Sequence, residues 1–73
     1  MLTYVTFGQE HVHDIDGIQL NKNTVAVIKC SSARDGRDKA FELFGPFFYT
    51  TYYDTEWKAE KLEWFPEGLK HLP

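Results

Sequence analysis

The sequence contains a single cysteine, Cys30, and no apolar run near the roughly 20 residues that a membrane-spanning helix requires. A lone cysteine cannot form an internal disulfide, whereas small secreted domains commonly depend on several. Residues 1–5 carry neither a basic segment nor an apolar core, so we expect no secretion signal. These absences predict a protein of the reducing cytosol with no membrane partner.

Positive charge is also scarce. Eight Lys and Arg residues stand against eleven Asp and Glu residues, for a net charge of −3. General affinity for nucleic acid requires a surplus of basic side chains on one face of a protein. The only locally basic stretch is residues 24–45, where the excess is a single charge. We therefore expect no direct binding of nucleic acid.

Motifs that would indicate catalysis are missing. The chain has no HExxH or CxxC spacing, no glycine-rich phosphate loop, and no Ser, His and Asp in a supporting context. Paired catalytic carboxylates cannot be picked out either. We expect a protein that is not an enzyme and that carries no cofactor.

Aromatic residues are abundant: six Phe, four Tyr and two Trp in 73 residues. A domain of this size buries only about 60% of its unfolded surface, and aromatic side chains provide large apolar area from few positions. We expect one domain spanning residues 1–73. Its last segment, 54–73, is an aromatic and acidic tail whose order the pattern leaves open.

Three segments in the first half have the composition of strands. Residues 2–8 are rich in β-branched and aromatic side chains. The dipeptide Asp16-Gly17, with apolar residues on both sides, predicts a β-hairpin. Residues 24–30 form a continuous apolar run, which is typical of a strand at the centre of a sheet or covered on both faces.

Residues 31–45 predict a helix. Ser32 is a favourable N-cap, Asp35 places a carboxylate in the first turn, and Gly45-Pro46 is a strong stop signal. Gly36 either lets the helix approach the sheet closely or marks a later helix start. The predicted inward stripe consists of Ala33, Arg37, Ala40, Phe41 and Phe44.

The same helix carries three basic side chains, at Arg34, Arg37 and Lys39. They suit a phosphate or an acidic partner, but Asp35, Asp38 and Glu42 alternate with them. The simpler interpretation, a solvated polar face, is therefore favoured.

The second half is less regular. Residues 47–53 predict an aromatic strand, 57–63 one or two helical turns or a loop, and 69–72 a short strand or tail. The order of elements predicts an α+β fold, with a small three- to four-stranded, mainly antiparallel sheet and one helix packed on one face. If strands 24–30 and 47–53 are neighbours, the crossover makes that pair parallel and right-handed.

His11 and His13 are the candidate metal ligands. Two imidazoles two residues apart on a strand point the same way, about 6.6 Å apart, and this spacing suits metal ligation. Further ligands would come from Glu10, Asp14, Asp16, Cys30 and His71. No second spaced pair supports the site, so surface histidines are the favoured interpretation. Cys30, just before the helix, is interpreted as a buried structural residue rather than a nucleophile.

The candidate partner-binding residues lie in the second half of the chain. Tyr and Trp are enriched at the energetic centres of protein interfaces, and acidic side chains there could imitate a nucleic-acid backbone and occupy a basic channel on another protein. Core packing and ordinary solubility charge are the competing interpretations. The candidates are Tyr49, Tyr52, Tyr53, Trp57, Trp64, Glu56, Glu60 and Glu63.

Several segments resemble a family of short phage-encoded proteins. The resemblance covers residues 3–53 and rests on Tyr4-Val5-Thr6-Phe7-Gly8-Gln9, on His-x-His at 11–13, on Val25–Ile28, and on Arg37-x-x-Ala40-Phe41-Glu42-x-Phe44-Gly45. It implies an accessory gene expressed in a bacterial cytoplasm and implies no reaction. In size and charge alone, the chain is similar to small acidic phage inhibitors such as anti-CRISPRs.

The leading hypothesis is a phage-type accessory protein that occludes a nucleic-acid-binding site on a host protein or ribonucleoprotein complex. A small metal-binding or nucleic-acid-processing factor that uses His11 and His13 is the alternative, and a homodimer without ligand is a third reading.

Overall fold

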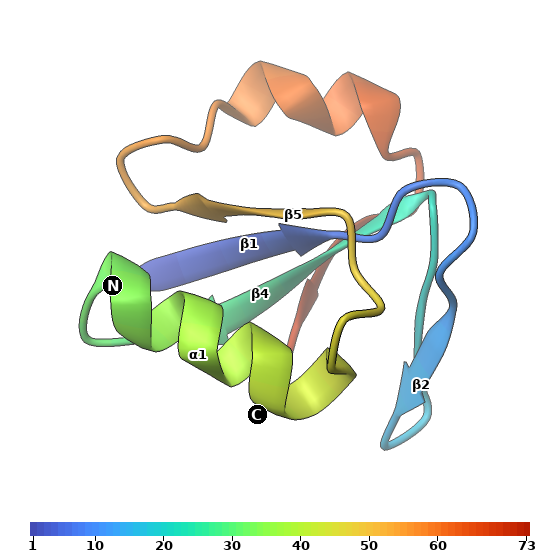
Figure 1. The fold of residues 1–73 in the computed structure, drawn as a ribbon. Helices are drawn as coiled ribbons and strands as arrows, with labels where there is room; N and C mark the ends of the chain where they lie inside the picture. The colour runs from blue at the N-terminus through green and yellow to red at the C-terminus, as the bar shows by residue number, and fades with distance from the viewer.

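The computed structural model describes residues 1–73 and contains a four-stranded sheet, a separate β-hairpin, one α-helix and one 3-10 helix. The sheet has the order β5-β1-β4-β6. Its strands are β1 (Leu2–Thr6), β4 (Thr24–Lys29), β5 (Thr50–Tyr53) and β6 (Gly68–His71). The α-helix, α1 (Ala33–Phe44), packs on one face of this sheet (Figure 1). The predicted α+β class is confirmed.

The sheet is mixed, with two antiparallel pairings and one parallel pairing. β1 is antiparallel to both β4 and β5, while β4 and β6 are parallel. The strand that follows the helix does not lie beside β4, because β1 is inserted between them. The parallel pair that was expected if strands 24–30 and 47–53 were neighbours therefore does not form. The strand parallel to β4 is β6 instead.

The aromatic strand is shorter than predicted. It begins at Thr50 instead of residue 47, because the chain turns where the helix ends and the Phe47 amide donates to the Phe44 carbonyl at 3.1 Å. Pro46, within this turn, has no amide hydrogen to contribute to a ladder. The Tyr49 amide then donates to the Thr6 carbonyl at 2.8 Å, which brings the chain alongside β1.

The predicted hairpin is confirmed as β2 (His13–Ile15) and β3 (Ile18–Leu20). Both turn residues have positive φ, 51° at Asp16 and 84° at Gly17, as the common two-residue turn between antiparallel strands requires. The Asp14 carboxylate accepts a hydrogen bond from the Gly17 amide at 3.0 Å.

The helix begins and ends where its sequence signals predict. The Ser32 hydroxyl accepts from the Asp35 amide at 3.0 Å, and the Asp35 carboxylate accepts from the Ser31 amide at 2.9 Å. These bonds satisfy two donors at the helix start that have no partner within the helix. At the other end, Gly45 adopts a φ of 59° and donates to the Phe41 carbonyl.

The buried face of the helix differs from the predicted stripe. Gly36, Ala40 and Phe44 are buried, whereas Ala33, Arg37 and Phe41 are exposed. The stripe is rotated because Gly36 lies directly on β1: a Cβ atom there would lie 1.8 Å from Thr3 Oγ1 and 2.6 Å from Thr3 Cβ. The close approach expected of Gly36 is confirmed, and the later helix start is excluded.

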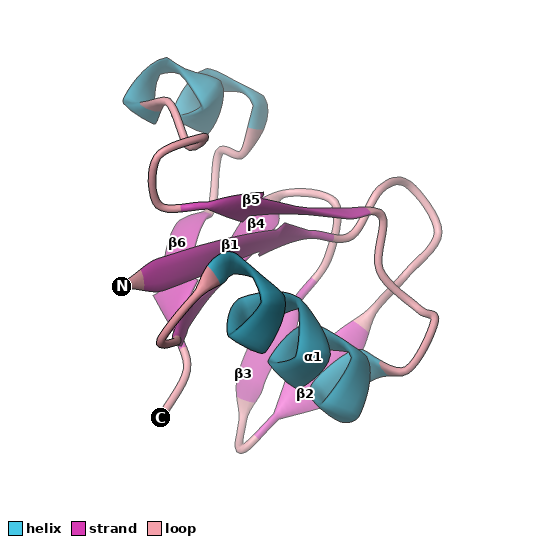
Figure 2. Cartoon of the chain, turned by 60° about the vertical axis from the view of Figure 1, so that its left-hand side comes forward, coloured by secondary structure: helices cyan, strands magenta, loops and turns pink.

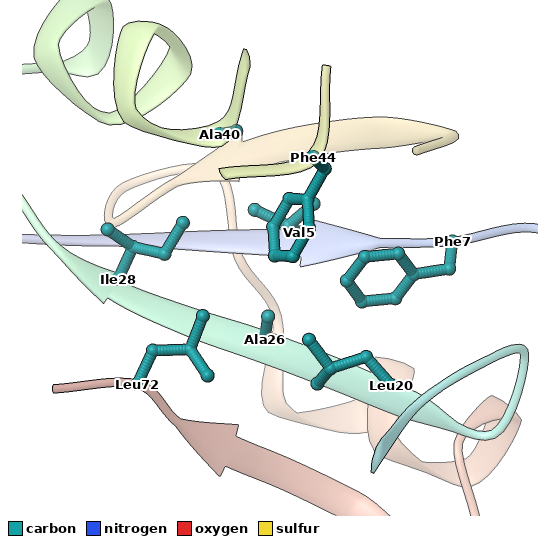
Figure 3. Close-up of a cluster of buried hydrophobic side chains, with 8 residues drawn as sticks. All are labelled: Val5, Phe7, Leu20, Ala26, Ile28, Ala40, Phe44 and Leu72. Atoms are coloured by element: carbon teal, nitrogen blue, oxygen red, sulfur yellow. The ribbon is translucent and has the colours of Figure 1, made fainter. Parts of the chain in front are cut away.

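The core lies between α1, the central strands and the hairpin (Figure 3). The Phe7 and Phe44 rings meet edge to face at 5.1 Å, which joins the end of the helix to the chain just after β1. The predicted apolar strand is confirmed as central, since every β4 residue except Lys29 is buried. The cluster consists of Val5, Phe7, Leu20, Ala26, Ile28, Ala40, Phe44 and Leu72.

Residues 57–67 form a second layer on the sheet face opposite α1. η1 (Ala59–Trp64) is a 3-10 helix, and Figure 2 shows it and α1 on different sides of the sheet. The Trp57 ring stacks on Tyr4 with centroids 4.6 Å apart and planes 5° apart. The chain then returns through β6, and Leu72 enters the core on the α1 side. The aromatic and acidic tail is thus built into the fold.

Replacing Gly36 by Ala should destabilise the protein by about 2–4 kcal/mol, because the added methyl group would overlap Thr3. The sign is diagnostic, since Gly to Ala in an unconstrained helix is stabilising by about 1 kcal/mol. Urea unfolding of both proteins measures the difference. A gain in stability would contradict the close contact.

The hydrogen bond from the Ser31 amide, assisted by Lys39, lowers the pKa of Asp35 below its ordinary value of 3.8. Because the folded-state pKa is the lower one, this stabilisation is present above about pH 4 and is lost as the pH falls through the folded-state pKa. Carbon NMR titration of the carboxyl group should show the lowered pKa. In Asp35→Asn, this part of the pH dependence of stability should disappear.

Candidate functional site: an aromatic groove

An open groove of about 440 Å³ lies on the η1 side of the molecule, beside the edge strand β5. Side chains from four separate segments line it: the end of β1 with the loop after it, the turn before β4, β5 with the residue before it, and the end of η1. We call it the aromatic groove. Its lining residues are Thr6, Gly8, Gln9, Lys22, Tyr49, Tyr52, Trp64 and Phe65.

Tyr49 is held by its backbone and presents its ring to solvent. Its amide donates to the Thr6 carbonyl at 2.8 Å, yet 73% of the residue is exposed. Gly8 makes this position accessible, because a Cβ atom there would lie 3.3 Å from Tyr49 Cβ and the backbone has a φ of 66°. A bulky residue at position 8 would press against the tyrosine.

Trp64 is exposed to nearly the same extent as Tyr49, at 71%. It ends η1, where the Phe65 amide donates to the Leu62 carbonyl at 3.0 Å and the Gly68 amide to the Phe65 carbonyl at 2.9 Å. Ordered backbone on both sides therefore carries an indole that the fold leaves uncovered. Exposed Trp and Tyr side chains on rigid backbone are suited to docking another molecule.

Tyr52 forms the floor between the groove and the second layer. Its ring meets Trp57 edge to face at 5.8 Å, and the Lys61 ammonium lies 4.7 Å from its centroid. Trp57 itself is half-buried between Tyr4 and Tyr52. It supports the groove from beneath and is not part of the lining.

Tyr53 points to the opposite face of the sheet. It pairs with Thr3, which contacts α1, so its side chain lies on the helix side. Desolvation, with the nearby charges of Cys30 and Asp54, raises the pKa of Tyr53 above its ordinary value of 10.0. Of the five aromatic candidates, the structure brings together Tyr49, Tyr52 and Trp64 and separates Trp57 and Tyr53 from them.

The three acidic candidates are also divided. Glu56 is tied to β5, since its carboxylate accepts from the Tyr53 amide at 2.9 Å. Glu60 and Glu63 are exposed on η1, the same short helix that ends in Trp64. Of the three acidic candidates, Glu60 and Glu63 are the two whose carboxylates make no hydrogen bond or ion pair.

The histidine pair is not arranged as a metal centre. His11 precedes β2 and does not share a strand with His13. His13 packs 4.8 Å from the Phe44 ring, and its Nε2 lies 2.6 Å from the Phe47 carbonyl oxygen. Cys30 is buried with its Sγ 3.2 Å from Thr3 Oγ1. No three His, Cys, Asp or Glu side chains gather in a group that could hold a metal ion.

Sequence reasoning missed five of the eight residues that line the groove: Thr6, Gly8, Gln9, Lys22 and Phe65. These residues come from distant segments and show no shared spacing. The one local signal was Gly8 at the end of the predicted strand 2–8, which indicates a special backbone conformation without identifying the residue that contacts it.

Comparison with protein-family models, with curated proteins and with solved structures gave no match. No helix in the structure has both the length and the apolar composition needed to cross a membrane.

Trp57→Ala should destabilise the protein by about 2 kcal/mol, because it removes the stack on Tyr4 and the contact with Tyr52. Trp64→Ala, which removes an exposed ring, should change stability by less than about 0.5 kcal/mol. Thermal or urea unfolding of the two variants measures both values. Equal losses would mean that Trp64 is part of the fold.

Proposed function

We propose that this protein acts by binding another protein through the aromatic groove, without catalysis. The observation that carries the proposal is the pair Tyr49 and Trp64, which are 73% and 71% exposed and line the same groove. Burial of these two rings would stabilise the domain, and a domain with so small an interior has few other large apolar side chains to bury. Their exposure therefore lowers the stability that the fold could reach. The presence of both side chains on one open surface supports a binding role.

The charge around the groove indicates a basic target. Glu60 and Glu63 lie on the helix that carries Trp64, and the chain as a whole has a net charge of −3. Lys22 and Lys61 lie nearer the rings, where Lys61 covers Tyr52. We infer a partner with an apolar pocket for the indole and a basic rim facing η1, because opposite potentials speed association and exclude wrong partners.

The kind of target is proposed from the resemblance to phage accessory proteins. A basic surface on a bacterial defence complex is commonly the path of a nucleic acid. A small acidic protein seated there would block that path in the host cytoplasm. The proposed partner is therefore a host protein or ribonucleoprotein complex whose nucleic-acid-binding site is occluded.

The test begins with capture of partners from a bacterial host, followed by binding measurements on the purified partner. Trp64→Ala and Tyr49→Ala should each weaken binding by about 2 kcal/mol, roughly thirtyfold, without unfolding the protein. Glu60→Lys/Glu63→Lys should lower the association rate several-fold and reduce its salt dependence. Glu56 is left unchanged because it supports β5.

Lys58→Gln is the matched surface control, since Lys58 is exposed and lies outside the groove. It should bind as the parent protein does. A partner that binds Trp64→Ala with unchanged affinity would exclude the groove as the docking surface. Light scattering that shows a dimer broken by Trp64→Ala would replace the host target with a second copy of the chain.

A further inference from the structure

A second groove, of about 320 Å³, lies on the helix side of the molecule between the first half of α1 and β5. It is polar where the aromatic groove is apolar, and we call it the polar groove. Its volume is within the range of small-ligand sites, about 300–1,000 Å³. The lining residues are Thr3, Ala33, Arg34, Arg37, Thr51, Tyr53 and Glu56.

Two arginines one helical turn apart line this groove. Arg34 and Arg37 are three residues apart on α1, so their side chains project from neighbouring positions on one face. Arg37 is also held from the side, because its guanidinium carbon lies 5.7 Å from the Phe41 ring centroid. Phe41 in turn packs against Phe48 at 5.0 Å. These contacts restrict the position of the Arg37 guanidinium.

Neither guanidinium is neutralised by an ion pair. Asp38 is four residues after Arg34, the favourable helical spacing, yet the ion pair of the structure joins Asp35 to Lys39 at 3.3 Å. Lys39 additionally donates to the Lys29 carbonyl at 3.0 Å. The three basic helix residues, which the sequence presents as one solvated face, are therefore different: Lys39 is engaged, and Arg34 and Arg37 face the polar groove.

Hydroxyl groups complete the wall opposite the arginines. Thr51 and Tyr53 are on the helix side of β5, because they pair with Val5 and Thr3 of β1. The Tyr53 hydroxyl keeps its proton at neutral pH and can donate, as any tyrosine hydroxyl does. The groove thus combines two permanent positive charges with hydroxyl donors, and it does not use the helix start, which Ser32 and Asp35 occupy.

We infer that the polar groove binds a phosphate group carried by a small ligand, with Arg34 and Arg37 as the charge partners and Thr51 and Tyr53 as hydroxyl donors. Planar guanidinium groups match phosphate oxygens two at a time, which makes arginine the preferred side chain for this anion. A phosphate dianion also balances the charge of two arginines, which a single carboxylate does not.

Glu56 is the one acidic residue in the lining. Its Oε1 accepts from the Tyr53 amide, so the carboxylate is fixed at the rim of the groove. It opposes an anion by like charge and sets the affinity below the value that the arginines alone would give. Glu56→Gln keeps an oxygen for the Tyr53 amide and removes the charge, so this variant should bind phosphate several-fold more tightly.

The experiment is a titration of the whole chain with inorganic phosphate and, separately, with ribose 5-phosphate, followed by amide and arginine side-chain NMR. Both probes should give saturable shifts at Ala33, Thr51, Tyr53 and the two arginines. Tighter binding of ribose 5-phosphate would identify a sugar phosphate as the ligand type, and equal binding would show that the groove recognises the phosphate group alone. Chloride at matched ionic strength is the reference.

Arg34→Gln and Arg37→Gln should each weaken binding by about tenfold, and the double variant should abolish the saturable shifts. Lys29→Gln/Lys58→Gln is the matched control, because it removes two exposed positive charges that lie outside both grooves. It should retain binding. Phosphate shifts that are absent, or that persist in Arg34→Gln/Arg37→Gln with its fold intact by circular dichroism, would overturn the inference.

Discussion

The close contact between α1 and β1 at Gly36 and Thr3 is the constraint on which the rest of the structure depends. Because position 36 has no side chain, the helix axis comes close enough for Ala40 and Phe44 to reach the core. A short chain without disulfides has few other ways to exclude water from its sheet. The same approach turns Arg34 and Arg37 away from the core and toward β5.

β1 contacts both layers that cover the sheet, α1 on one face and residues 57–67 on the other. Its residues alternate, so that Val5 belongs to the core below α1 while Tyr4 receives the Trp57 ring from the second layer. Aromatic stacking takes the place of a second long helix on this side. The covering is incomplete beyond Trp57, and the rings of Tyr49 and Trp64 remain outside it.

β5 is the edge strand that both grooves share. Tyr52 faces the aromatic groove, and Thr51 and Tyr53 face the polar groove. The end of the strand is protected against pairing with another strand, because the Tyr53 amide is bound by Glu56 and the Tyr53 carbonyl accepts from Glu56 and Trp57 amides. We therefore expect ligands to contact the side chains on the two faces of β5 and not its backbone edge. A protein target on one face and a phosphate ligand on the other are compatible on this architecture.

The sequence by itself determined the features whose causes are local. The hairpin at Asp16-Gly17 follows from backbone preference, the helix limits from Ser32 and Gly45, and the central position of β4 from its continuous apolar run. The α+β class follows from the order of these elements.

The tertiary structure alone decided which helix face is buried, because this depends on the fit between Gly36 and Thr3, two residues from different elements. It alone decided that β6 lies parallel to β4, and it divided the aromatic candidates between packing and surface. Those outcomes depend on contacts between distant segments, and no local spacing encodes them.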